Sequence, residues 1–318
     1  MNNSDFTLTP FEKCGELASA FNLDIDLAVK RDDLFPMPGG GIKSRKILYI
    51  MDELLKNNHD VIVTNGGPQS NHARSAALMA AKLGLRCHLI IVLDPGVKYP
   101  LTGNLLLMKM AGAVIQYCRK DQLSDVMDRA MEHYGKAGHH PAYIWGGGHN
   151  YAGTHAFVEA AHEVQKQCGS WIPDYLILAS GTGSTQAGLA IGYDEFKTEV
   201  IGISVAREQL RGAAIIRECI KEYYRHLNIP DKDHVIYFYD NWTFDGYEKT
   251  NDDLLRVINR AAKSGIILDP TYSGKGFYGL VELVTSEKIP RGSKVLFWHT
   301  GGLLNVMGSS LSEGSITL

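Results

Sequence analysis

Short apolar runs alternate along the chain with longer segments in which apolar residues recur at helical spacing. Nearly every position in the short runs is apolar, which is typical of strands that are buried on both faces. Strands are predicted at residues 27–30, 60–64, 86–93, 113–117, 174–179 and 198–205, with further ones near 142 and 294. Helices are predicted at residues 47–55, 73–84, 102–111, 153–167, 189–196, 207–226, 252–262 and 279–285. This order predicts an α/β fold with open, mostly parallel sheets that are flanked by helices.

Composition and charge narrow the class of protein. The chain has 318 residues, of which 45% are hydrophobic and 21% charged, as in ordinary globular enzymes. A net charge of −3 argues against nucleic acid as the main partner. The five cysteines are dispersed and form no CxxC pair, so we expect neither a disulfide framework nor a zinc site. With no signal-peptide pattern and no long apolar segment, we expect a cytoplasmic protein without a membrane partner.

A glycine-rich loop precedes Lys43, and its sequence is Gly39-Gly-Gly-Ile-Lys43-Ser-Arg-Lys46. Glycine lets a backbone adopt positive φ and approach a ligand closely. We expect Ser44 to be the N-cap of the helix that follows. A lysine in this position could bind a phosphate, or it could be an amine nucleophile whose pKa is lowered by burial and by cationic neighbours. The remaining alternative is a solvated basic turn.

The loop over residues 180–188 has the composition of a phosphate-binding site. Gly181 and Gly183 allow backbone N–H groups to converge on one anion, while Thr182, Ser184 and Thr185 add hydroxyl donors. The positive end of the next helix would contribute as well. The loop lacks the GK[ST] ending of a P-loop and the GxGxxG spacing of a dinucleotide site, so a nucleotide is disfavoured. The alternative is a tight turn with hydroxyl caps.

Three polar residues, Ser70, Asn71 and His72, lie where a predicted strand meets a helix N-terminus. Ser70 and nearby N–H groups could bind a carboxylate, and Asn71 could donate to a ring oxygen. Simple capping of the helix is the alternative. We expect His72 to be a positioned hydrogen-bonding group and not a metal ligand, since no second ligand stands at a usable spacing.

Two loop tyrosines, Tyr247 and Tyr272, each have a glycine nearby, which suits a phenol that stands over a cleft. A structural role is the alternative for either residue. Taken together with the loops above, they complete a set of motifs that occurs in one order along the chain. The motifs are Lys30-Arg-Asp-Asp-Leu, Gly-Gly-Ile-Lys43-Ser-Arg-Lys46, Gly-Gly-Pro-Gln-Ser70-Asn71-His72, Thr182-Gly-Ser-Thr-Gln-Ala-Gly188, Leu268-Asp-Pro-Thr-Tyr272-Ser-Gly-Lys275 and His299-Thr-Gly-Gly302.

This ordered set resembles the D-cysteine desulfhydrase / 1-aminocyclopropane-1-carboxylate (ACC) deaminase family, and the resemblance spans residues 9–308. It implies a pyridoxal-phosphate enzyme of fold type II, similar to tryptophan synthase β, with the cofactor in a cleft between two domains. The expected smaller domain, residues 47–155, is inserted into a larger cofactor-binding domain of residues 1–46 and 156–318. A homodimer and a small amino-acid substrate are further expectations from the resemblance.

The resemblance implies that several residues bind the cofactor. Lys43 would form the Schiff base and later carry a proton, and Lys46 would contact the phosphate. Asn71 would bind the ring hydroxyl, and the hydroxyl of Ser273 would stand against the ring nitrogen. The phosphate cup would be formed by Gly181, Thr182, Gly183, Ser184 and Thr185.

The resemblance also implies that other residues act on the substrate. Ser70, with Asn71, would bind the substrate carboxylate, and Ser70 could be a nucleophile or a proton relay. His72 would support this loop. Tyr247 and Tyr272 would act near the reacting carbon of the substrate.

Two departures from the family pattern bear on the reaction. ACC deaminases carry a glutamate at the position of Ser273, whereas desulfhydrases carry a neutral hydroxyl residue, and a neutral group makes a weaker electron sink. Ile42 replaces the usual asparagine before the lysine, which affects substrate fit. We therefore expect a lyase that carries out α,β-elimination on a small amino acid and releases a keto acid and ammonia. The alternatives are an ACC deaminase, a β-replacement synthase, a racemase and a non-catalytic ligand-binding protein.

Overall fold

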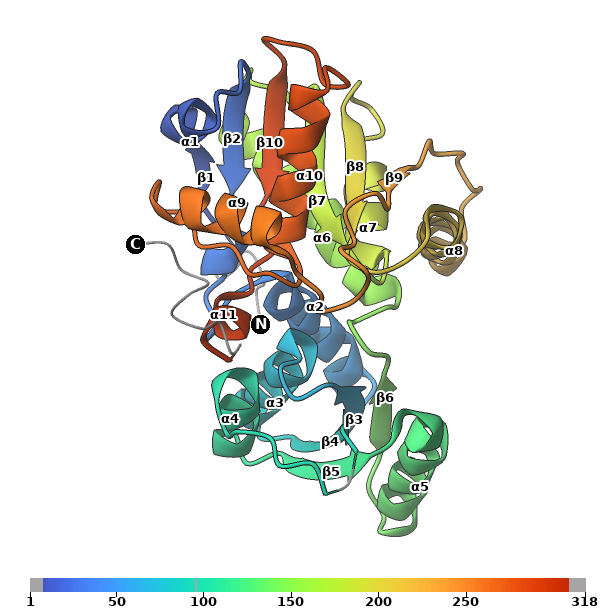
Figure 1. The fold of residues 1–318 in the computed structure, drawn as a ribbon. Coiled ribbons are helices and arrows are strands. Elements are labelled where there is room, and N and C mark those ends of the chain that lie inside the picture. The colour runs from blue at the N-terminus through green and yellow to red at the C-terminus, as the bar shows by residue number, and fades with distance from the viewer. Residues whose placement is uncertain (1–7, 95, 309–318) are drawn as a thin grey trace.

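A computed structural model describes residues 8–94 and 96–308, and within them the chain forms two sheets that are stacked end to end (Figure 1). The larger sheet has six strands, and only the edge strand β1 runs antiparallel to its neighbour. In spatial order these strands are β1 (Phe11–Lys13), β2 (Asp26–Lys30), β10 (Lys294–Trp298), β7 (Tyr175–Ser180), β8 (Glu199–Ser204) and β9 (Tyr237–Tyr239).

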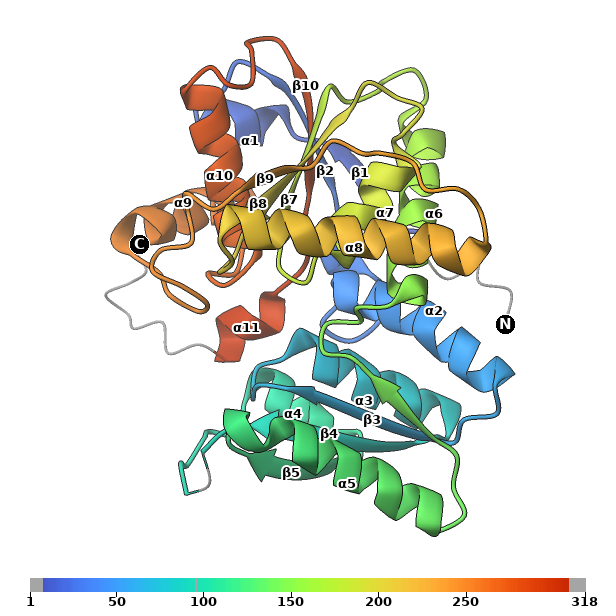
Figure 2. The ribbon, with the colours of Figure 1, turned by 90° about the vertical axis from the view of Figure 1, so that its right-hand side faces the viewer.

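The larger sheet is buried on both faces because its strands are apolar at nearly every position. In β2, Leu27 and Val29 pack with one group of helices, and Ala28 packs with the other. The first group is α1 (Gly15–Ala20), α9 (Asp252–Ala262) and α10 (Ser273–Thr285). The second is α6 (Tyr151–Cys168) and α7 (Ser184–Gly192), over which α8 (Gln209–Leu227) lies (Figure 2).

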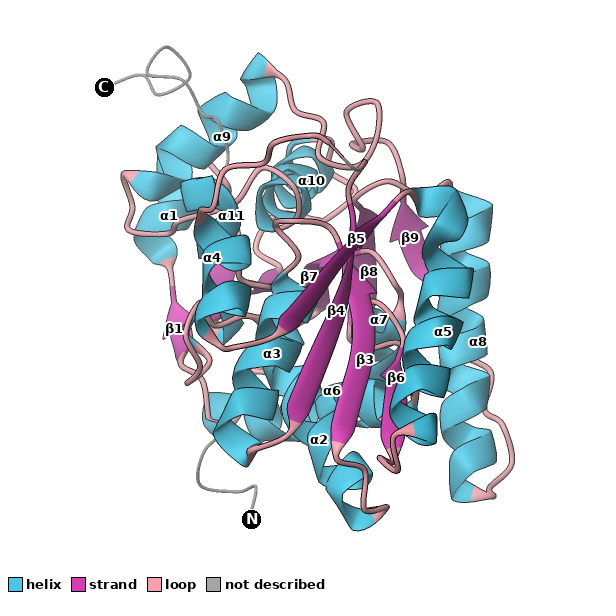
Figure 3. Cartoon of the chain, turned by 90° about the horizontal axis from the view of Figure 1, so that it is seen from below, coloured by secondary structure: helices cyan, strands magenta, loops and turns pink. Residues whose placement is uncertain are grey.

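The smaller sheet has four strands, all parallel, and lies between two helical layers (Figure 3). Its strands are, in spatial order, β5 (Val114–Cys118), β4 (Arg86–Val92), β3 (Val61–Gly66) and β6 (Pro141–Ile144). One face packs against α2 (Ile42–Lys56), α3 (Asn71–Leu83) and α4 (Gly103–Met110). The other face is covered by α5 (Leu123–Lys136), for which no helix was predicted.

Helix α2 links the two sheets, because it packs on α3 of the smaller one and on α6 of the larger one. The prediction of an α/β fold with two mostly parallel sheets is confirmed. The predicted domain boundaries at residues 46/47 and 155/156 fall inside α2 and α6, and this division stays a prediction. Of the helices in the described part of the chain, none has the length and apolar character needed to cross a membrane.

Several helices begin earlier than predicted, among them three at predicted binding loops. Helix α2 begins at Ile42 and its N-cap is Gly41, so the prediction that Ser44 is the N-cap is wrong. Helix α7 begins at Ser184 instead of residue 189, and α10 begins at Ser273 instead of residue 279. In each case the earlier start brings residues of a predicted binding loop into the first turn of a helix.

Candidate active site

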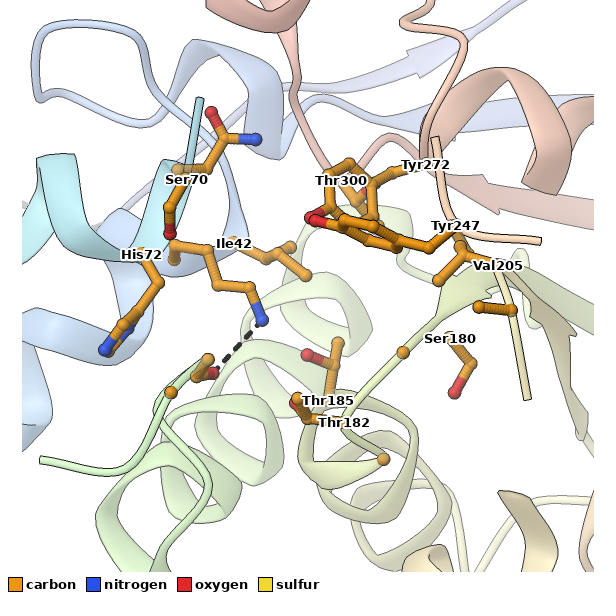
Figure 4. A pocket seen from close by; sticks show the side chains of 18 of the residues that line it. Ile42, Ser70, His72, Ser180, Thr182, Thr185, Val205, Tyr247, Tyr272 and Thr300 are labelled. Atoms are coloured by element: carbon orange, nitrogen blue, oxygen red, sulfur yellow. Dashed lines mark hydrogen bonds between the residues drawn. The ribbon is translucent and has the colours of Figure 1, made fainter. Parts of the chain in front are cut away.

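A cavity of about 620 Å³ lies at the carboxyl ends of strands from both sheets. Residues at or just after the ends of β3, β6, β7, β8 and β10 line it. Predicted site residues that also line the cavity are Lys43, Ser70, Asn71, His72, Gly181, Thr182, Gly183, Thr185, Tyr247 and Tyr272. Figure 4 shows Ser70 and His72 across the cavity from Tyr247 and Tyr272, with Thr182 and Thr185 below. The fold therefore brings together loops that are distant in sequence.

Lys43 projects into this cavity from the first turn of α2. The turn depends on Gly41, whose φ of +88° is unfavourable for residues with a Cβ, and a Cβ there would lie 3.1 Å from the carbonyl oxygen of Thr300. Ser44 is inside the helix, where its hydroxyl donates to the carbonyl oxygen of Gly40 at 2.7 Å. The glycines thus place Lys43 at the junction of the helix and the cavity.

The amine of Lys43 has one hydrogen bond, from Nζ to the carbonyl oxygen of Gly147 at 3.1 Å (dashed line in Figure 4). Burial, together with the positive charge of Arg207, lowers the pKa of Lys43 to about 8. The prediction of a lowered pKa named the sequence neighbours Arg45 and Lys46 as the cationic groups. In the structure the contributing cation is Arg207, while Arg45 pairs with Asp32 and Glu163 away from the cavity.

Lys46 lies one turn further along α2 and is 1% exposed, although it does not line the cavity itself. Its Nζ donates to the hydroxyl of Ser184 at 2.6 Å, at the N-terminus of α7. Within the described residues no carboxylate lies within ion-pair distance of Lys46. Burial, together with the charge of Lys43, holds the pKa of Lys46 well below its usual value.

The loop before α7, residues 181–183, is held by hydrogen bonds from residues that were not predicted to belong to the site. Arg207 donates to the carbonyl oxygen of Gly181, and His149 donates through Nδ1 to the carbonyl oxygen of Thr182 at 3.0 Å. Gly183 has a φ of +85°, and a Cβ there would lie 3.2 Å from side-chain atoms of α8. The loop thus passes directly into the N-terminus of α7, beside the amine of Lys46.

Ser70 is the N-cap of α3, and its Oγ accepts a hydrogen bond from the N–H of Ala73 at 3.2 Å. Capping does not consume the hydroxyl proton, so Ser70 keeps a donor at the cavity wall. The amide of Asn71 donates to Asn305 at 2.6 Å and accepts from Asn104 at 3.0 Å. Asn71 therefore has one amide proton left for a ligand.

His72 is buried at 4% exposure, and its Nε2 lies 2.9 Å from the hydroxyl of Thr64. That hydroxyl donates to the carbonyl oxygen of Ile144 at 2.6 Å, so Nε2 of His72 is the donor to Thr64. Burial, with the charges of Lys43 and Lys46, lowers the pKa of His72 to about 3. A positioned hydrogen-bonding group is what the sequence predicted for His72, and the structure adds that the imidazole is neutral.

The hydroxyl groups of Tyr247 and Tyr272 are hydrogen-bonded to each other at the cavity wall. Burial raises the pKa of Tyr247 to about 12 and that of Tyr272 well above its usual value. Both phenols are therefore protonated at neutral pH. Tyr272 is fixed by Asp269, whose carboxylate accepts from the N–H groups of Thr271 and Tyr272 at 3.0 Å.

A buried amine, a loop that leads into a helix N-terminus and two neutral phenols now frame one cavity. Residues 4–301 match the sequence family described as "Pyridoxal-phosphate dependent enzyme". The chain belongs to this family. Pyridoxal phosphate is accordingly its cofactor, and the predictions of enzyme class and cofactor are confirmed.

Individual members of the pyridoxal-phosphate family resemble the chain over most of its length. A D-cysteine desulfhydrase from Klebsiella pneumoniae subsp. pneumoniae is 32% identical over 92% of this chain and 91% of that protein. A crystal structure of an ACC deaminase homologue is 31% identical, with a TM-score of 0.85 over 96% of this chain and 94% of that one. Threonine deaminase isoform 2 from Solanum lycopersicum is 17% identical, with a TM-score of 0.65 over 94% of this chain and 80% of that one, a likeness of fold alone. The predicted family resemblance is confirmed by the first two.

The described residues fit pyridoxal phosphate on their own chemistry. Lys46 is a buried cation without a carboxylate, and it lies beside the N-terminus of a helix, where a phosphate is favoured. Two buried hydroxyls in the cavity wall, those of Ser180 and Thr300, have no hydrogen-bond partner among the described residues. Unsatisfied buried polar groups of this kind indicate a ligand that completes them.

Ser273 does not line the cavity. Its hydroxyl donates to Asp269 at 2.7 Å and accepts from the N–H of Asp269 at 2.9 Å. Thr300, labelled in Figure 4, also lines the cavity, and its hydroxyl has no hydrogen-bond partner among the described residues. Thr300 lies in the motif His299-Thr-Gly-Gly302, but the sequence predicted no role for it.

Proposed function

We propose that the protein catalyses α,β-elimination from a small amino acid with a good β-leaving group and releases a keto acid and ammonia, with D-cysteine as the first candidate substrate. The observation that carries the proposal is the buried amine of Lys43, which faces a cavity walled by two neutral phenols and by the cap of α3. The 32% identity to a D-cysteine desulfhydrase supports the choice of substrate.

Lys43 is the proposed attachment point for the cofactor and the proposed carrier of the substrate's α-proton. Its lowered pKa leaves a useful fraction of neutral amine near pH 7, and only the neutral amine can act as a nucleophile or base. Lys46, Ser184 and the other predicted cup residues are proposed to hold the phosphate. When bound, pyridoxal phosphate supplies the electron sink for the α-carbon.

Ser70, together with the N-terminus of α3, is proposed to bind the substrate carboxylate. A helix N-terminus favours negative charge, and the Ser70 hydroxyl adds a donor at that position. His72 supports this loop as a neutral group through Thr64. Asn71, with one free amide proton, is proposed to bind the ring hydroxyl of the cofactor.

Tyr247 and Tyr272 are proposed to deliver a proton to the departing group, because both phenols are neutral and share one hydrogen bond. Ser273 remains the proposed neutral group on the ring-nitrogen side, although its hydroxyl donates to Asp269. Thr300, in the cavity wall, has a hydroxyl without a partner among the described residues. A weak electron sink favours elimination over opening of a cyclopropane ring.

We further propose a cytoplasmic homodimer, as the family resemblance implies. Met110 on α4 and Met307 on α11 (Leu303–Gly308) are 72% and 69% exposed, and these helices pack on each other. Exposed apolar side chains on two helices that pack together are candidates for a protein interface. Sedimentation velocity of the purified protein tests the dimer.

The test of the function is a screen for keto-acid release. Purified protein reconstituted with pyridoxal phosphate is assayed with the D and L forms of cysteine and 3-chloroalanine, and with ACC. We expect release from at least one β-substituted amino acid, and Lys43→Ala should reduce it by about 10³-fold or more. Lys56→Ala is the matched control, since Lys56 is an exposed lysine at the other end of α2.

Other outcomes identify the alternatives. Release only from ACC would indicate an ACC deaminase. Product formation only with an added second nucleophile would indicate a β-replacement synthase, and α-proton exchange without keto acid would indicate a racemase. A wild-type protein that binds pyridoxal phosphate without covalent attachment to Lys43 and releases no keto acid would contradict the proposal.

A further inference from the structure

Lys275 is a fully buried lysine on α10, three residues after Tyr272. Its Nζ donates to three backbone carbonyl oxygens, those of Val205 at 3.1 Å, Thr243 at 2.8 Å and Gly246 at 2.7 Å. An ammonium group has three protons, so each proton of Lys275 has its own acceptor. One side chain thereby joins α10, the end of β8 and the loop that contains Tyr247.

The segment of residues 243–248 needs such an external support. Phe244, Asp245 and Glu248 have φ values of +52°, +64° and +61°, and Gly246 has a φ of +132°. Positive φ is unfavourable for residues with a Cβ and persists only where surrounding contacts impose it. Lys275 bonds to the carbonyl groups of two residues in this strained segment, Thr243 and Gly246, the second of which directly precedes Tyr247.

The ring of Phe244 contributes a second contact to the same arrangement. It lies 5.9 Å from Nζ of Lys275 and packs edge-on against Tyr278 of α10, with 5.1 Å between the ring centroids. These contacts, like the hydrogen bonds, tie the strained segment to the helix that begins next to Tyr272. The two phenols of the cavity wall are therefore held relative to each other mainly through α10.

We propose that Lys275 is a positioning residue for the reaction, which holds the hydroxyl of Tyr247 against that of Tyr272 by fixing the backbone of residues 243–246. The inference rests on the proposed function, in which the two phenols deliver the proton to the leaving group. Lys275 itself does not line the cavity, so it acts through Tyr247 and not on the substrate.

The test is a double-mutant cycle on the reconstituted enzyme with Lys275→Met and Tyr247→Phe. Methionine keeps the length of the side chain and removes all three donors. We expect each single variant to lower kcat by about 10- to 100-fold, within the usual range for a proton-transfer group. In the double variant, kcat should be within about 3-fold of that of Tyr247→Phe, because residues that act through one group are not additive. If the loss of kcat in the double variant equalled the product of the two single losses, the proposal would be overturned.

A second readout does not depend on activity. Amide hydrogen exchange of residues 244–248 should be faster in Lys275→Met than in the wild type, with and without pyridoxal phosphate. Exchange of the loop at residues 180–188 and the visible absorption of the Lys43-bound cofactor should be unchanged. Unaltered exchange of residues 244–248 would also overturn the proposal. If Lys275→Met does not fold, Lys275→Gln, which keeps a donor, replaces it in both measurements.

Lys30→Met is the matched control, because Lys30 is a second fully buried lysine, and neither it nor its partners Thr9, Glu163 and Gln167 line the cavity. Its effect on kcat should be the same in wild-type and Tyr247→Phe backgrounds. A Tyr247→Phe variant with full kcat would overturn both the role of Tyr247 and that of Lys275, while keto-acid release by the wild type would leave the elimination itself intact.

Discussion

Arg45 and Lys46 are adjacent in the sequence and each is 1% exposed, yet helix α2 places them in two different environments. Arg45 donates to both oxygens of Asp32, at 2.7 and 3.0 Å, and to Glu163 at 2.7 Å. Among the residues that the structure describes, Lys46 donates only to the hydroxyl of Ser184. One buried cation is neutralised by the protein, and the other has only a neutral partner.

The environment of Arg45 is a closed set of groups that we call the carboxylate cluster: Thr9, Lys30, Asp32, Arg45 and Glu163. Lys30 donates to Glu163, and the hydroxyl of Thr9 donates to Asp32 at 2.8 Å while it accepts from Arg45 at 3.0 Å. Burial alone would raise the pKa of Asp32, but the charge and hydrogen bonds of Arg45 outweigh it and lower that pKa. The cluster satisfies its own charges and needs no ligand.

Lys43, which lines the cavity, and Lys46, one turn further along α2, differ from this cluster. Burial lowers the pKa of each, and among the described residues no carboxylate opposes that shift. A buried cation without a counter-charge lowers stability. A ligand that binds only the folded protein and supplies the missing anion restores that stability. The comparison indicates which buried charges maintain the fold and which maintain a binding site.

The largest expected effect comes from breaking the carboxylate cluster. Glu163→Gln keeps the shape of the side chain but leaves Lys30 and Arg45 with one carboxylate, Asp32, between them. We expect the free energy of unfolding to fall by about 3 kcal/mol or more, the range for breaking a buried ion pair. Urea unfolding of the apoprotein measures it. Asp52→Asn, which breaks the exposed pair of Asp52 with Lys56, should have no measurable effect.

The next effect concerns Lys46, whose replacement should not lower the free energy of unfolding of the apoprotein. Lys46→Met removes a buried cation that has no carboxylate, so the apoprotein should be at least as stable as the wild type. Its dissociation constant for pyridoxal phosphate should rise about 10- to 100-fold, because a charge-assisted hydrogen bond to the phosphate is lost. Titration of apoprotein with cofactor measures the constant. An apoprotein destabilised as strongly as Glu163→Gln would contradict the comparison.

The sequence identified Lys43, the cup loop and the polar cap of α3 because each lies in a local pattern of glycine and hydroxyl residues. The local pattern does not show that Arg45 and Lys46 differ, although the family resemblance implied a phosphate contact for Lys46 alone. Their partners are set by tertiary packing, since Asp32 is 13 positions away from Arg45, and Ser184 is 138 positions away from Lys46. Because a helix turns by about 100° per residue, adjacent residues point in different directions. The groups that each one meets belong to segments that are distant in sequence.

Other features were missed for equally physical reasons. Arg207 reaches the cavity from the loop after β8, and nothing in its local sequence distinguishes it from a surface arginine. The support of Tyr247 by Lys275 involves positive φ at Phe244, Asp245 and Glu248. Positive φ could not be predicted at these positions from the residue types. Thr300 becomes conspicuous only when the burial and isolation of its hydroxyl are known.

A third prediction uses the lowered pKa of Lys43. With a pKa of about 8, roughly a tenth of the amine is neutral at pH 7, against about one part in 3,000 for an unperturbed lysine. Because only the neutral amine attacks, covalent uptake of pyridoxal phosphate by the apoprotein should rise about tenfold from pH 6 to pH 7 and level off above pH 8. Stopped-flow absorbance measures the rate. The rate for N-acetyl-lysine amide, divided by the neutral fraction of that amine at each pH, serves as the reference that removes the cofactor's own ionisation. A rate that still rises tenfold per unit above pH 9 would show an unperturbed lysine.

The smallest effect compares two buried threonines, one on each side of α2. Thr300→Val replaces a hydroxyl that has no partner among the described residues, so the stability of the apoprotein should change by less than about 0.5 kcal/mol. Thr9→Val removes a hydroxyl that bonds to both Asp32 and Arg45, and should cost about 1–3 kcal/mol. The effect on cofactor affinity should be reversed, with a loss of about fivefold for Thr300→Val and none for Thr9→Val. If Thr300→Val left the dissociation constant of pyridoxal phosphate unchanged, its free hydroxyl would not serve the cofactor, and the unsatisfied groups of the cavity wall would have to be assigned to the substrate.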